Sequence, residues 1–182
     1  MMRTALYLFG GLLLGLVIHL VVILILPRIS ENAAYARIAA IDALNKTTLL
    51  ALPKAGEPNP LHLDPDMSYG LCKLDLSAGP GEVTGTLPLA FWSVAVYDTA
   101  GTVLYSTTNR DGIGQTLDLG IFDPAQTRLL AEQKIDISPG LLIVESRTDQ
   151  VFVIVRLAPP HPSMRTRYEA QLERLACRNI AI

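Results

Sequence analysis

The hydrophobic pattern separates an unbroken apolar segment near the N-terminus from a longer region in which apolar and polar residues alternate. Residues 5–26 contain no Lys, Arg, Asp or Glu. As a helix with a rise of 1.5 Å per residue, this segment is about 33 Å long, which is enough to cross the hydrocarbon core of a bilayer. We therefore expect residues 1–27 to form a transmembrane anchor.

A cleaved signal peptide is the alternative interpretation of this segment. The apolar part of a signal peptide spans about 7–15 residues, and a small-x-small cleavage site follows it closely. Here the apolar run is longer, and the nearest such site, Ala34-Tyr35-Ala36, lies well beyond Pro27. These differences favour an uncleaved signal anchor.

The two segments that follow Pro27 have different patterns. Ile38, Ile41 and Leu44 recur at helical spacing after Ser30, a residue type that caps helices well. We expect residues 28–46 to form a juxtamembrane helix. Residues 47–66 contain four prolines and are predicted to be a linker or a surface loop.

Short alternating runs from residue 67 onward, separated by Gly, Pro, Asp or Asn, predict a β-rich domain that extends to residue 182. The predicted strands have the sequences LCKLDLS, FWSVAVYD, TVLYSTT, QTLDLGIF, QKIDIS, LLIVES and VFVIVRLA. We expect a mainly β fold, an antiparallel β-sandwich or curled sheet with edge helices, plus the N-terminal transmembrane helix.

Two helices are predicted at the edges of this domain. Asp123 is placed to cap a short helix that begins with Pro124 and has the sequence PAQTRLLAEQ. The final segment, SMRTRYEAQLERLACRN, reads as an amphipathic helix with Tyr168, Leu172 and Leu175 facing the domain.

The segment FWSVAVYD is predicted to be a central strand. Trp92, Val94 and Val96 share one face of it, and Phe91, Ala95 and Tyr97 share the other. Both faces are apolar, so we expect packing on both sides.

The segment NRDGIG after the next strand is more polar than a simple connection needs. We expect Asn109, Arg110 and Asp111 to form a ligand-binding site together with Trp92, because a guanidinium suits a carboxylate or a phosphate. The alternative is structural: Arg110 forms a salt bridge to Asp111 or Asp118, or a carbonyl contact that fixes the loop.

Other motifs predict no catalytic residue, cofactor or metal. The chain has no G-x-S-x-G elbow and no P-loop. His62, Asp64 and Asp66 alternate as metal ligands do, but a polar turn around Pro65 is the simpler interpretation. Residues 28–182 carry 14 of the 15 Lys and Arg against all 17 Asp and Glu, without a basic stripe, so we expect no nucleic acid partner.

Cys72 and Cys177 are the two cysteines of the chain. They form no CxxC motif, and an even pair fits one disulfide in an oxidising compartment, here between the first strand and the C-terminal helix. Two buried thiols in a cytosolic protein are the alternative.

Within the apolar segment, Gly11 and Gly15 form a G-x-x-x-G motif, and His19 lies one turn further along the same face. Small residues let helices approach closely, and a histidine in a membrane needs a hydrogen-bond partner. This face predicts a homodimer through the helix. Glycines that occur in an apolar segment without such a role are the alternative.

Several motifs keep the order found in a pair of bacterial families, the domains of unknown function 1254 and 1214. These are the Phe91-Trp92-Ser93 strand start, the Asp98 to Gly101 turn, the Asn109-Arg110 pair and the Ile113-Gly114 pair. The chain resembles these families over residues 62–160, and it is similar to a small membrane-anchored branch. The resemblance implies a β-rich, often exported fold, and it brings no established activity.

We therefore expect a bacterial inner-membrane protein with a single membrane pass and a β-rich domain in the periplasm. The number of Lys and Arg near the anchor leans weakly toward the opposite topology, but the cysteine pair and the family resemblance outweigh it. The domain is predicted to bind an envelope protein or a small ligand without catalysis. One alternative is an envelope enzyme, such as a hydrolase, with a site near Asn109 and Arg110. Another is an assembly protein that works through its anchor.

Overall fold

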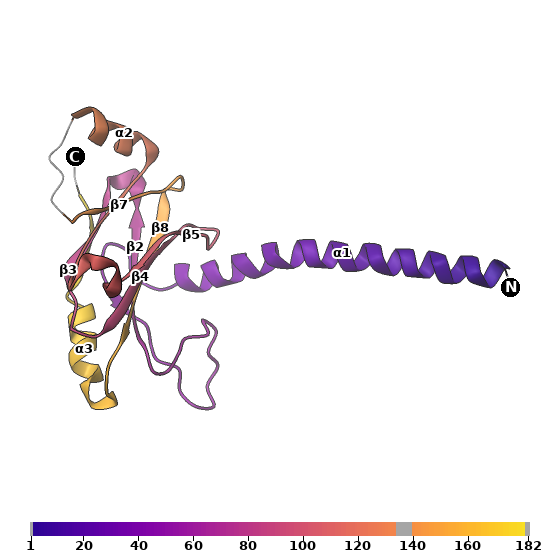
Figure 1. Ribbon diagram of the computed structural model, residues 1–182, viewed down its shortest axis with the longest axis horizontal. Coiled ribbons are helices and arrows are strands. Elements are labelled where there is room, and N and C mark those ends of the chain that lie inside the picture. The colour runs from indigo at the N-terminus through magenta and orange to yellow at the C-terminus, as the bar shows by residue number, and fades with distance from the viewer. Residues whose placement is uncertain (1, 134–139, 181–182) are drawn as a thin grey trace.

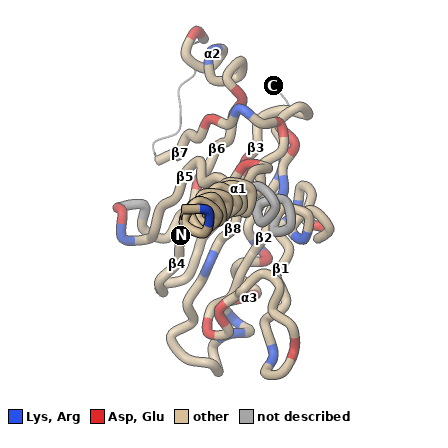
Figure 2. Tube along the Cα trace, turned by 90° about the vertical axis from the view of Figure 1, so that its right-hand side faces the viewer, with Lys and Arg blue, Asp and Glu red and all other residues tan. Residues whose placement is uncertain are grey.

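A long N-terminal helix leads into a β-sandwich in the computed structural model, which describes residues 2–133 and 140–180. Helix α1 (Met2–Ala39) projects from one face of the sandwich, and its N-terminus lies farthest from the sheets (Figure 1). In the end-on view, α1 runs toward the viewer in front of the sheet that contains β4, β8 and β2 (Figure 2).

The first part of α1 is long and apolar enough to cross a membrane. Its Met2–Leu26 segment has a mean hydropathy of 2.8, and none of it is buried against the rest of the protein. The expected anchor and juxtamembrane helix form one continuous helix, because α1 continues through Pro27 and Ser30. The predicted helix end near residue 46 is wrong: α1 ends at Ala39, and the chain then turns inward so that Ala43 is fully buried.

The sandwich consists of a five-stranded and a four-stranded sheet. In spatial order, the five-stranded sheet contains β1 (Thr48–Leu49), β2 (Ser68–Asp75), β8 (Gln150–Ala158), β4 (Phe91–Tyr97) and β5 (Val103–Thr108). The four-stranded sheet contains β7 (Leu142–Glu145), β6 (Thr116–Phe122), β3 (Gly81–Thr86) and β9 (Ala176–Asn179). The predicted β-sandwich is therefore confirmed.

The strand pairs are antiparallel except for β6 and β7, which are parallel. A parallel pair needs a crossover connection. Helix α2 (Pro124–Gln133), which was predicted from its cap, lies in this crossover. The Asp123 carboxylate accepts hydrogen bonds from the backbone N–H groups of Ala125 and Gln126, at 2.7 and 2.8 Å.

Strand β4 follows the predicted alternation. Trp92, Val94 and Val96 are fully buried between the two sheets. On the outer face Ala95 is buried, Tyr97 stacks on Phe152 with ring centroids 5.1 Å apart, and Phe91 remains 40% exposed. Packing therefore covers the outer face only in part.

The outer face of the five-stranded sheet carries a second apolar cluster. Its buried members are Ala43, Leu50, Tyr69, Leu71 and Phe152. The last turns of α1 pack on this cluster through Tyr35 and Ile38. The helix is therefore attached to the sheet by side-chain packing as well as by the chain itself.

Strand β3 was not among the predicted strands, because its sequence GEVTGT contains two glycines and no clear alternation of apolar side chains. A Cβ atom at Gly81 would lie 2.7 Å from Leu74 Cδ1, and one at Gly85 would lie 2.6 Å from Leu175 Cδ2. These distances are too short, so both glycines make room for the leucines that pack on β3.

The final predicted helix is shorter than expected. Helix η3 (Pro162–Met164) leads into α3 (Arg165–Leu172), and the last residues form strand β9. Tyr168, Leu172 and Leu175 are buried, as predicted. The predicted strand QKIDIS begins at Gln133, which belongs to α2, and its other residues lie outside the described part of the chain.

Cys72 and Cys177 form a disulfide, with their Cα atoms 6.1 Å apart. The predicted pairing is confirmed. Its predicted location on the C-terminal helix is wrong, because Cys177 lies on β9 opposite Val83 of β3. The bond therefore joins the two sheets of the sandwich.

Candidate functional site

Residues 109–111 lie in the loop for which the sequence analysis predicted a binding site. They belong to η2 (Asn109–Ile113), a single π-helical turn between β5 and β6. The Asp111 carboxylate accepts hydrogen bonds from the Thr108 N–H at 2.8 Å, the Thr108 hydroxyl at 2.9 Å and the Thr107 hydroxyl at 3.1 Å. These bonds hold the pKa of Asp111 below its ordinary value, and the bond from the backbone N–H of Thr108 has the largest effect.

Asn109 and Arg110 contact the start of β4. The Asn109 side-chain amide donates a hydrogen bond to the carbonyl oxygen of Ala90 at 3.0 Å. The Arg110 guanidinium lies over the Phe91 ring, 5.7 Å from its centroid. Among the described residues Arg110 forms no salt bridge, so the expected alternatives of a bond to Asp111 or Asp118 are not seen.

The structure does not place Trp92 beside these loop residues on a shared surface. Trp92 is fully buried and points into the core, whereas its neighbour Phe91 points outward to Arg110. The Trp92 Nε1 atom has no hydrogen-bond partner among the described residues. The structure therefore unites Asn109, Arg110 and Asp111 and separates Trp92 from them.

The other candidate residues lie on the exposed helix α1 and in a polar turn. Gly11, Gly15 and His19 lie on the exposed apolar part of α1, and a Cβ atom at either glycine would meet nothing within 4 Å. Asp64 accepts a hydrogen bond from the Asp66 N–H at 2.8 Å, which is the predicted polar turn. No group of three metal-ligating side chains occurs in residues 2–133 and 140–180.

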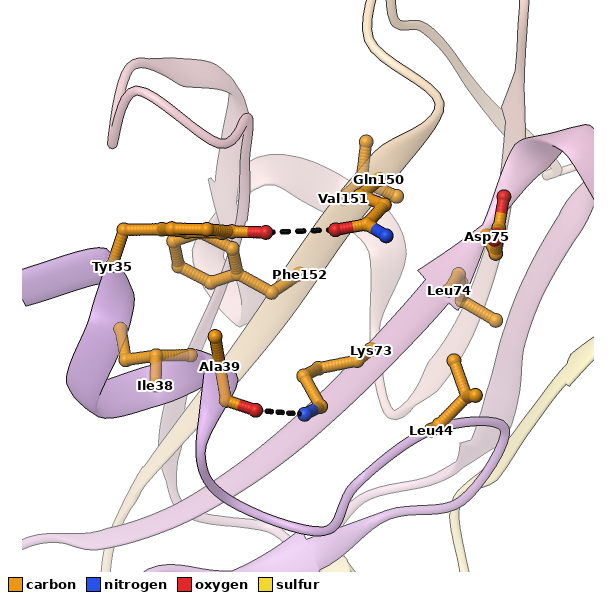
Figure 3. Close-up of a pocket in the computed structure, with 10 residues that line it drawn as sticks. All are labelled: Tyr35, Ile38, Ala39, Leu44, Lys73, Leu74, Asp75, Gln150, Val151 and Phe152. Atoms are coloured by element: carbon orange, nitrogen blue, oxygen red, sulfur yellow. Dashed lines mark hydrogen bonds between the residues drawn. The ribbon is translucent and has the colours of Figure 1, made fainter. Parts of the chain in front are cut away.

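A cavity of about 230 Å³ lies where α1 meets the sandwich, and we call it the junction cavity (Figure 3). Its walls come from the end of α1 (Tyr35, Ile38 and Ala39), from Leu44, from residues 73–75 of β2 and from residues 150–152 of β8. Segments far apart in the sequence therefore share one cavity.

Two hydrogen bonds connect the helix to the strands across this cavity (Figure 3). The Tyr35 hydroxyl donates to Gln150 Oε1 at 2.8 Å, and the Lys73 ammonium donates to the Ala39 carbonyl oxygen at 2.8 Å. A cation at the C-terminus of a helix also interacts favourably with the helix dipole. Lys73 therefore fixes the end of α1 on the sheet.

The junction cavity combines apolar walls with a few polar groups. Phe152 and Ile38 supply apolar surface, while Lys73, Asp75 and Gln150 supply a cation, a carboxylate and an amide. Small-molecule sites commonly have such a lining, although most are larger, at about 300–1,000 Å³. The arrangement can hold a small polar group or a side chain of a partner.

Sequence reasoning missed this cavity. Tyr35 lies in the predicted juxtamembrane helix, Lys73 in the first predicted strand and Gln150 just before the last one. No sequence signal connects these three residues, because they lie on separate segments of the chain. Only the fold brings the three segments together.

Comparison with known proteins gives a family match. The family model described as "Protein of unknown function (DUF1254)" matches residues 44–175, which include Lys73 and Gln150. No curated protein matches the chain.

Two solved structures are similar to the chain. The VPA0106 protein from Vibrio parahaemolyticus is 11% identical with a TM-score of 0.59, and the match covers 83% of this chain and 35% of that one. An uncharacterized protein from Burkholderia cenocepacia is 14% identical, with coverages of 84% and 41%, and its TM-score of 0.43 is too low to support an argument. The chain spans about a third of the Vibrio protein, and this likeness shows the fold alone.

Proposed function

The chain belongs to the DUF1254 family of proteins of unknown function, as the resemblance of its motifs indicated, and from its helix, its disulfide and its junction cavity we propose that it is a membrane-anchored binding protein of the bacterial envelope. In this proposal, α1 crosses the inner membrane once and the β-sandwich lies in the periplasm. The sandwich binds an envelope protein or a small ligand and catalyses no reaction.

The apolar helix supports the anchor. Its Met2–Leu26 segment is exposed along its whole length, so it is not a core helix of the sandwich. Residues 27–39 continue the same helix for about 20 Å at 1.5 Å per residue. In this proposal they hold the sandwich above the headgroups.

The disulfide supports the periplasmic side. Disulfides persist in oxidising compartments and are rare in the cytosol, where thiols are kept reduced. The Cys72–Cys177 bond joins the two sheets, so it belongs to the folded core of the domain. Both cysteines are also buried, which protects the bond from reductants.

The junction cavity is the observation that carries the binding proposal. The helix that bears the apolar span also forms one wall of this cavity, and the strands form the others. An occupant would contact both parts and would therefore lie close to the membrane. By contrast, the described contacts of Asn109 and Asp111 build a loop, and they give no support to a hydrolase at that place.

Site-specific photocrosslinking in living cells tests this binding. Leu44 lines the junction cavity and is 55% exposed, so a photoreactive residue there should yield a discrete adduct. Leu129 on α2 is 45% exposed and away from the cavity, and it is the matched control. If the occupant is a small ligand, native mass spectrometry of the full chain in mild detergent should detect it as added mass.

The expected result is an adduct from position 44 that Lys73→Glu removes and Lys54→Glu leaves intact. A small ligand that the wild type retains and the Lys73→Glu variant loses would support the binding proposal equally. Identical adducts from positions 44 and 129, or neither an adduct nor a ligand, would contradict the binding proposal.

A further inference from the structure

The junction cavity lies beyond the headgroup layer when α1 crosses the membrane as proposed. Tyr35, a cavity residue on α1, follows Leu26 at the end of the apolar span by nine residues. Nine residues of helix cover about 13 Å, at 1.5 Å per residue. One headgroup layer adds only about 5–8 Å to the hydrocarbon core. A lipid that stays in the bilayer therefore does not reach the cavity.

The junction cavity is better suited to a side chain than to a whole small molecule. Its volume of about 230 Å³ is below the range of about 300–1,000 Å³ that is usual for small-molecule sites. Ile38, Leu44 and Phe152 supply apolar walls, and the Gln150 amide lies beside them (Figure 3). Leu44 is also 55% exposed, so the cavity is accessible from outside. A long side chain from a partner chain fits this lining.

The side of α1 that faces the cavity is apolar inside the membrane as well. Val17 precedes Tyr35 by 18 residues, which are five turns of about 3.6 residues, so the two residues point to the same side. By the same count, Leu24 points between Ile38 and Ala39. Val17 is 54% exposed and Leu24 is 71% exposed. A helix that packs on this side of α1 is therefore led to the cavity.

A second copy of the chain does not fit beside α1 at the level of the cavity. The end of α1 lies in front of the five-stranded sheet, with strands on both sides of it (Figure 2). Packed helices lie about 8–10 Å apart. At that distance the sandwich of a second copy would occupy the same space as the first. The glycine face is compatible with a dimer, because Gly15 points about 200° away from Val17 and crossing helices separate above their contact.

We propose that the partner at the junction cavity is a different membrane protein. Its transmembrane helix packs on the side of α1 that carries Val17 and Leu24 and continues past the headgroups. The end of this helix places a side chain in the cavity, against Ile38, Leu44 and Phe152. This inference rests on the proposed function and names the class of partner. A soluble partner would contact the cavity alone.

Photoreactive residues placed at different depths of the full chain test this in living cells. Position 44 reports on the cavity, and positions 24 and 17 report on the membrane. Leu26 and Val22 are the matched controls, because each is exposed and has the same side chain as its counterpart. Leu26 points about 200° away from Leu24, and Val22 points about 140° away from Val17. Mass spectrometry of each adduct identifies the protein that it contains.

The expected result is an adduct with one and the same protein from positions 44, 24 and 17. Positions 26 and 22 should yield several-fold less of it, and the captured protein should contain a transmembrane segment. An adduct from position 44 alone would overturn this inference and leave the proposed function intact. Equal adducts from positions 24 and 26, or adducts of twice the chain mass from positions 44 and 24, would also overturn it.

A cavity variant tests whether the two contacts belong to one partner. Ala39→Trp adds bulk to a residue that lines the cavity and should reduce the adducts from positions 44 and 24 several-fold together. Ala36→Trp is the matched control, because Ala36 is exposed on the same helix and is not among the residues that line the cavity. It should leave both adducts unchanged.

Non-reducing electrophoresis checks that each variant still forms the Cys72–Cys177 bond of the folded sandwich. If Ala39→Trp fails this check, Leu44→Trp takes its place, with the adduct from position 24 as the measurement. A membrane adduct that is insensitive to a filled cavity would contradict the inference.

Discussion

Cys72 on β2 and Cys177 on β9 are bonded across the interior of the sandwich and join its two sheets at a sequence separation of 105 residues. Both sulfur atoms lie in the main core, among side chains of both sheets. The bond therefore closes a loop that contains most of the domain.

Removing this bond should lower the free energy of unfolding by about 4–5 kcal/mol in the chain-entropy model. The variant is Cys72→Ala with Cys177→Ala, and the measurement is urea denaturation of the full chain in detergent. Reduced wild-type protein is the control and should unfold at a similar urea concentration. A double variant as stable as the oxidised wild type would contradict the prediction.

The strands that were predicted correctly contain strong alternation. In β4 and β8, successive residues point to opposite faces and both faces are mainly apolar, so the sequence carries the period of the strand. Strand β3 lacks this signal because Gly81 and Gly85 have no side chains. Leu74 and Leu175 occupy the space where their Cβ atoms would lie. Its pattern depends on residues that are distant in the sequence.

The structure of the C-terminal segment also depends on residues that are distant in the sequence. The prediction continued the helix past Leu172, but Ala176–Asn179 pairs with β3 as a strand, and Cys177 in it is bonded to Cys72. The candidate site was limited in the same way. The polar character of residues 109–111 was visible, whereas their use in capping the loop and bonding to Ala90 required the fold.

Asp111 should make stability depend on pH in the acid range. Its pKa is lowered from 3.8 in the folded protein, so its contribution is fully present above that value and is lost as the pH falls through the folded pKa. Asp111→Asn should therefore be less stable than wild type at pH 7, with the difference shrinking below about pH 4. Chemical denaturation at several pH values measures this, and a difference that is constant from pH 7 to pH 3 would refute it.

Asn109 should matter more for stability than Arg110. Asn109→Ala removes a partly buried hydrogen bond and leaves the Ala90 carbonyl oxygen without that donor, at a cost of about 1–2 kcal/mol. Arg110→Ala loses an exposed cation–π contact of about 0.5–1 kcal/mol. Urea midpoints of the two variants give the order. The reverse order would make Arg110 the residue that fixes the loop.

The glycine face of α1 should promote self-association. Gly11→Leu with Gly15→Leu adds bulk on the face that includes His19 and should weaken dimers several-fold. Gly10→Leu is the matched control, because Gly10 is also a glycine in open space but points about 100° away. Energy transfer between labelled chains in vesicles reports the association. Equal effects of the two changes on association would exclude this face as the dimer interface.

The central claim is that α1 holds a disulfide-bonded sandwich outside the cytoplasm, and reporter fusions after Ile182 test it most directly. Alkaline phosphatase folds only where its own disulfides form. We predict an active phosphatase fusion and an inactive cytoplasmic reporter at the same position. An inactive phosphatase together with an active cytoplasmic reporter would contradict the account.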